Sequence, residues 1–174
     1  MSEIPEAYRV MIAPLIERAR VLLEDGESLR PIAFVGSTAK RSINIVVLST
    51  ADGDVQASSA EQVRRVAHRE NADFVLTIME AWGLPPEKVG KYQAILEQYG
   101  SIEASPYAVD FVSFALETRE GSWVAQVQVK PKGVSKRKKT FGEPRFRLFT
   151  ESAGGFAELL PQPAERGDGG GTLH

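Results

Sequence analysis

Apolar and polar residues follow two patterns along the chain, one typical of helices and one typical of strands. Apolar residues recur at three- and four-residue steps, as in amphipathic helices, in residues 5–23, 58–71 and 87–99. Short apolar or alternating runs predict strands at residues 31–35, 43–48, 73–82, 107–118, 122–130 and 144–150. Hairpin-like connections dominate, so we predict an α+β fold. It has a mixed, mainly antiparallel sheet of about five to six strands packed with two to three helices.

Three local features add detail. The nearly continuous apolar run Asp73–Trp82 predicts a central strand covered on both faces. Ser58-Ser-Ala-Glu61 matches a capping box and predicts the start of the second helix. Pro14 lies inside the first helical pattern, where it removes a backbone donor, so this helix is expected to kink or restart there.

The composition favours one folded unit. Hydrophobic residues make up 43% and charged residues 25% of the 174 residues, as in ordinary globular domains. We predict a single domain over residues 1–160 and a flexible tail over 161–174, where glycine and proline are frequent. The longest apolar runs are strand-sized and the N-terminus is acidic where a signal peptide is basic, which favours a cytoplasmic protein without membrane contact.

The lack of cysteine and the scarcity of histidine limit the kinds of catalytic or metal site that the chain can form. The chain has no cysteine and two histidines, His68 and His174, which excludes thiolate sites and leaves too few ligands for a three-histidine zinc site. It has no linear phosphate-binding motif and no nucleophile elbow. No cofactor is therefore expected, and a binding role is favoured over an enzymatic one.

Positive charge is concentrated in residues 130–147. The chain has a net charge of −2, but this segment holds eight basic residues and one acid, a local charge of +7. Such a segment can neutralise phosphates, which predicts contact with nucleic acid or another polyanion. The alternative is a solvated loop whose lysines keep an edge strand from pairing with another molecule. The predicted binding residues are Lys132, Lys136, Arg137, Lys138, Lys139, Arg145 and Arg147, with Phe141, Phe146 and Phe149 as neighbouring aromatic residues.

Asp110, Gln128 and Lys130 are weaker candidates for catalysis. If the hairpin turns at residues 119–121, Asp110 faces Lys130. This spacing resembles the motif of the restriction-endonuclease-like nucleases, in which acids hold Mg²⁺ and a lysine positions the attacking water. Val109 stands in place of that family's usual proline, and Gln128 in place of its usual carboxylate. The simpler interpretation is a cross-strand ion pair on the solvated face of the sheet.

Glu80 is the best single candidate for an acid with a perturbed pKa, because it stands in the otherwise apolar run 73–82. We expect it near the end of the strand, with a solvated or arginine-paired carboxylate. His68 is expected to be an exposed residue of the second helix.

The strings Asn71–Leu76 (Asn-Ala-Asp-Phe-Val-Leu) and Met79–Trp82 (Met-Glu-Ala-Trp) follow an N-terminal helix and a Pro-Ile-Ala-Phe-Val strand. This arrangement resembles small uncharacterised bacterial and phage-associated proteins over residues 10–130. The resemblance implies no activity. The leading hypothesis is a non-catalytic binding or accessory protein that contacts a polyanion. The alternatives are a divergent metal-dependent nuclease and a protein-interaction module or homodimer that uses a sheet edge or the first helix.

Overall fold

The computed structural model describes residues 3–48, 55–134, 137–149 and 160. Within them the chain has the predicted α+β architecture, with three α-helices, a six-stranded antiparallel sheet and a small two-stranded sheet. The predicted flexible tail, residues 161–174, lies outside the described residues, as does Lys136. None of the described helices is long and apolar enough to span a membrane.

The main sheet is entirely antiparallel in the described residues. Its strand order is β2-β1-β3-β4-β5-β8. The predicted central strand, β3, lies between β1 and β4, and its first half is buried on both faces. The strands are β1 (Ile32–Ser37), β2 (Ser42–Val47), β3 (Phe74–Gly83), β4 (Val109–Thr118), β5 (Gly121–Gln128) and β8 (Arg147–Phe149).

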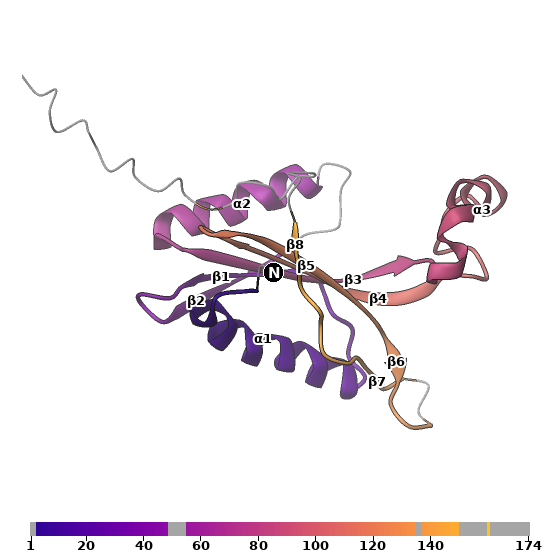
Figure 1. The fold of residues 1–174 in the computed structure, drawn as a ribbon, viewed down its shortest axis with the longest axis horizontal. Helices are drawn as coiled ribbons and strands as arrows, with labels where there is room; N and C mark the ends of the chain where they lie inside the picture. Colours follow the sequence, from indigo (N-terminus) through magenta and orange to yellow (C-terminus); the bar gives the residue numbers. More distant parts are fainter. Residues whose placement is uncertain (1–2, 49–54, 135–136, 150–159, 161–174) are drawn as a thin grey trace, which may run out of the picture.

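The two long helices pack on opposite faces of this sheet (Figure 1). α1 (Glu6–Glu24) covers the larger core, which includes side chains from β1, β3, β4 and β5. α2 (Val55–Glu70) packs mainly on β1 and β2 through the apolar stripe that includes Val63 and Ala67. No described helix covers β4, β5 and β8 on the α2 face. The Leu160 amide donates a 3.0 Å hydrogen bond to the carboxylate of Glu117 on β4 at this face, and elsewhere this half of the sheet remains open in the described part of the chain.

Several predicted boundaries differ from the structure. α1 is one uninterrupted helix, because Pro14 lies on its exposed side, where water can reach the carbonyl that loses its donor. α2 begins at Val55, three residues before the predicted capping box. The third helix begins as a 3₁₀ segment, η1 (Pro86–Lys91), which contains a glycine, and continues as α3 (Tyr92–Tyr99).

Two smaller features lie at the edges of the fold. Residues 84–108, here called the arm, contain η1 and α3 and extend from the far ends of β3 and β4, away from both long helices (Figure 1). Residues 130–140, here called the basic hairpin, contain β6 (Lys130–Pro131) and β7 (Lys139–Thr140), and β7 contacts α1.

Candidate nucleic-acid interface

The basic hairpin packs against the C-terminal end of α1. Nζ of Lys132 lies 3.2 Å from Oε1 of Glu24, and Nε of Arg137 donates a 3.3 Å hydrogen bond to the Gly26 carbonyl oxygen. A helix C-terminus has unpaired carbonyls and a partial negative charge, so cations there are favourable. These two predicted binding residues therefore hold the hairpin in place.

Lys139 lies against two acids of the sheet. Its Nζ is 3.3 Å from Oδ2 of Asp110 on β4, and Asp110 interacts with Glu80 on β3. Oε1 of Glu80 accepts a 2.7 Å hydrogen bond from the Leu29 amide, so a main-chain donor stands where water or an arginine was expected. Burial raises the pKa of the Glu80 carboxyl and the nearby Asp110 raises it further, while the Leu29 amide and Lys139 oppose the rise.

The predicted pairing of Asp110 with Lys130 is wrong by one residue. β4 and β5 are joined by the two-residue turn 119–120, and the Val129 amide donates to the Asp110 carbonyl oxygen. Adjacent residues of a strand face opposite sides of the sheet, so Gln128 lies on the face opposite Asp110. The nuclease-like combination of Asp110, Gln128 and Lys130 therefore does not come together.

Arg145 and Arg147 line a groove on the open half of the sheet, on the α2 face. Arg147 pairs with Val124 of β5, and the groove has a volume of about 540 Å³. Both arginine side chains are exposed, and neither makes a hydrogen bond or ion pair with another described residue. The side chains of the groove floor are small, polar or flexible: Thr77, Met79, Ser113, Ala115, Val124 and Gln126. Two cations thus stand over a floor that can donate and accept hydrogen bonds.

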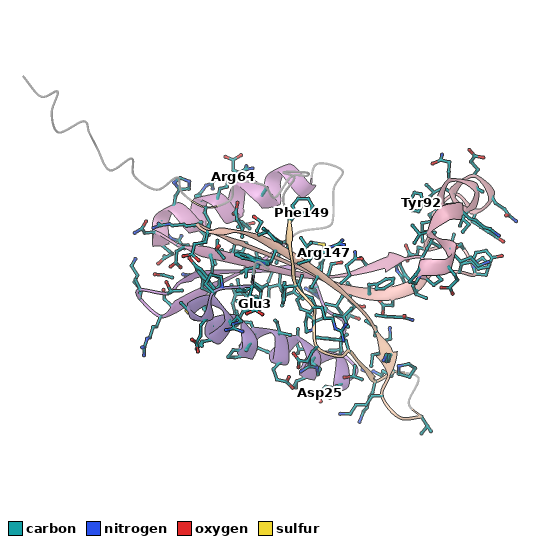
Figure 2. The ribbon with its side chains drawn as sticks, in the orientation of Figure 1. Glu3, Asp25, Arg64, Tyr92, Arg147 and Phe149 are labelled. Atoms are coloured by element: carbon teal, nitrogen blue, oxygen red, sulfur yellow. The ribbon has the colours of Figure 1, made fainter. Side chains whose placement is uncertain are left out.

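One of the three predicted aromatic residues is available at this surface. Phe141 and Phe146 pack against Phe114, with ring centres 5.7 Å and 6.0 Å apart, on the α1 side. Phe149 is 38% exposed and lies two residues from Arg147 on β8, so both side chains point to the same face (Figure 2). Phe149 can therefore stack on a base at the edge of the groove.

Sequence reasoning missed the floor of the groove. Thr77, Ser113 and Gln126 come from three strands, and the topology brings them together on one face. The available signal was small or polar residues at alternate positions of β3, β4 and β5, because a strand face without bulky apolar side chains has no core to fill. The alternation was recognised only in β5.

The remaining candidates do not form a site in the described residues. His68 is exposed on α2, as expected. Among the described residues, no group of three histidines, aspartates or glutamates could hold a metal ion. Lys138 has interactions of its own, and Lys130 is exposed on β6.

Comparison of the chain with protein-family models, curated protein sequences and solved structures found no significant match. The resemblance to small bacterial and phage-associated proteins therefore stays a prediction, and any function must be argued from the geometry.

Proposed function

We propose that the protein binds single-stranded nucleic acid on the open half of its sheet. In this proposal Arg145 and Arg147 contact phosphates, and Phe149 stacks on a base. The observation that carries it is the position of the two arginines, whose side chains are exposed at a groove and make no hydrogen bond or ion pair with other described residues. Arginine is well suited to phosphate because its guanidinium can donate two parallel hydrogen bonds.

The groove favours a single strand over a duplex. A duplex hides the faces of its bases, whereas an unpaired base can stack on Phe149. The Ser113 hydroxyl and the Gln126 amide on the groove floor can reach base edges. Unlike Lys132, Arg137 and Lys139, the two groove arginines do not hold other parts of the protein in place.

The nuclease alternative has weaker support. Glu80, Asp110 and Lys139 lie on the α1 side of the sheet, opposite the groove, and their side chains bond to one another and to the Leu29 amide. Their arrangement is explained by the packing of the basic hairpin on the sheet.

The test is the fluorescence anisotropy of a labelled single-stranded oligonucleotide at several salt concentrations. Replacing Arg145 and Arg147 together by glutamine should weaken binding. It should also reduce the slope of log K against log salt by about 1.4, the value for two lost phosphate contacts on a single strand. Phe149→Ala should cost about 1–3 kcal/mol of binding free energy with little change in slope.

The matched control replaces Arg9 and Arg18 by glutamine. Both are exposed on α1, on the other side of the sheet, so this variant loses the same charge without touching the groove. Equal weakening by the two double variants would reject the groove as the site. Tighter binding of duplex than of single strand would reject the proposed ligand.

A further inference from the structure

β2 forms one edge of the sheet: β1 pairs with its inner side, and no described strand pairs with its outer side. It has six residues, Ser42–Val47, and none of them is charged. The opposite edge, β8, has three residues and begins with Arg147. Short edges and charged side chains are the usual protection against pairing with another chain, and β2 has neither.

The outer side of β2 offers a regular row of main-chain groups. The Leu48 amide donates a 2.9 Å hydrogen bond to the Pro31 carbonyl oxygen, which sets the alternation of the β1–β2 ladder. In an antiparallel ladder every second residue bonds to its neighbour strand. Ile43, Ile45 and Val47 therefore direct their N–H and C=O groups outward, toward a missing strand.

Apolar side chains accompany these main-chain groups. Ile45 is 52% exposed and Val47 is 56% exposed. Both line a groove of about 300 Å³ between α1 and the sheet edge, whose apolar wall includes Leu22 and Phe34. A ligand for this edge must thus supply an extended backbone and apolar side chains together.

We propose that this edge pairs with β2 of a second copy of the chain, antiparallel, about a two-fold axis at Ile45. This register places Ile45 opposite Ile45 of the partner subunit and Ile43 opposite Val47 of the partner subunit. All three outward-facing residues then form hydrogen-bonded pairs, which is the largest overlap that they allow. The contact joins two six-stranded sheets into one and does not depend on the proposed nucleic-acid binding.

Charge also favours an identical partner. No charge on β2 would lose its water on pairing. The rim of the adjacent groove carries both signs, with Arg18 and Arg30 beside Glu27. A rotated copy presents the same mixed rim, with a net charge of only +1 on each subunit, and an acid of one copy can face an arginine of the other across the two-fold axis.

Single cysteines test the register directly, because the chain has none of its own. Hydrogen-bonded partners in an antiparallel ladder have Cα atoms about 5.5 Å apart, within the range for a disulfide. Ile45→Cys should therefore form a disulfide-linked dimer on mild oxidation. Ile43→Cys is the matched control: the two copies of position 43 would lie about 14 Å apart and should stay unlinked.

The mass in solution provides the second measurement. The unmodified chain should sediment at twice the monomer mass, and Ile45→Lys should sediment as a monomer with unchanged circular dichroism. Val10→Lys, an equally apolar-to-charged change at an exposed position of α1, should remain dimeric. A monomeric unmodified chain would overturn the proposal, as would a folded Ile45→Cys variant that stays unlinked.

Discussion

A single carboxylate, that of Glu80, joins three segments that are distant in the sequence. It accepts the Leu29 amide hydrogen from the loop after α1 and interacts with Asp110, which in turn binds Lys139 of the basic hairpin. Its pKa is raised, first by burial and then by Asp110. The folded state therefore binds a proton at Glu80 more readily than the unfolded state does.

The raised pKa of Glu80 predicts a specific pH dependence. Stability should fall as pH rises from the ordinary value of 4.5 through the raised pKa, because ionisation becomes less favourable in the folded state. Glu80→Gln cannot ionise, and its amide oxygen can still accept from Leu29. The variant should therefore gain stability relative to the unmodified protein between pH 4 and pH 7, as measured by urea unfolding.

Glu80→Ala is the companion variant. It leaves the Leu29 amide without its acceptor and should lower the free energy of unfolding by about 1–3 kcal/mol. A constant difference between Glu80→Gln and the unmodified protein across this pH range would contradict the assignment.

Gly36 predicts a packing effect. A Cβ atom at this position would lie 2.1 Å from the ring of Phe74, which is fully buried. Gly36→Ala should lower the free energy of unfolding by about 1–3 kcal/mol, the usual cost of overpacking a core. Gly90→Ala is the control, since nothing lies within 4 Å of its added Cβ, and thermal unfolding should show little change. Equal effects of the two variants would rule out the ring contact as the cause.

At the level of single residues, the sequence showed which side chains have unusual surroundings better than it showed which groups those side chains contact. Glu80 was identified from its apolar surroundings, and its perturbed pKa follows from the same cause. Its partner, the Leu29 amide, was not predicted, and Lys139, which pairs with Asp110, was placed only in a basic run. The partner of Asp110 was missed because a turn shorter by one residue changes which face each later side chain occupies.

Among the elements, the arm is the least integrated. Its main contacts are between η1 and α3. Within residues 84–108, the buried side chains are those of Leu84, Ile95 and Ser105. Several large apolar side chains near it are exposed, among them Trp82, Tyr92 and Tyr107. Figure 2 shows Tyr92 far from the two long helices. The arm should therefore contribute little to the core.

Replacing the arm by a short Asn-Gly turn tests whether the arm contributes to the stability of the sheet. Gly83 pairs with Val109 at the base of the arm, so a tight turn can close the β3–β4 hairpin there. The free energy of unfolding should be unchanged or raised, because each halving of a loop lowers its closure cost by about 0.6 kcal/mol. Loss of cooperative urea unfolding would show instead that the arm supports the sheet.

The helices and strands were predicted well where a segment showed one clear pattern of apolar residues. The alternation in residues 122–130 and the apolar run 73–82 became β5 and β3. The two short strands of the basic hairpin, β6 and β7, were not predicted, because lysines, Pro131 and Gly133 show no apolar period. The hairpin is held by Glu24 and the end of α1. Such contacts depend on where the chain returns in space, which local pattern does not encode.

For the whole molecule, the unequal cover of the sheet decides where ligands can bind. α1 closes one face, while α2 leaves β4, β5 and β8 open on the other within the described residues. Arg145 and Arg147 reach that open area because they alternate along the edge of the sheet with Phe146, which packs on Phe114 on the α1 side. The alternation of Phe146 and Leu148 with Arg145 and Arg147 predicted a strand there, but not which of its two faces is left uncovered.

The difference in length between β2 and β8 also limits how far the protein can assemble. A two-fold contact through β2 uses up that edge on both subunits. What would then remain at either end of the joined sheet is β8, three residues long and headed by an arginine, which is a poor template for another strand. Growth along the sheet would stop at the pair, so the same strand that invites association would not lead to open-ended fibres.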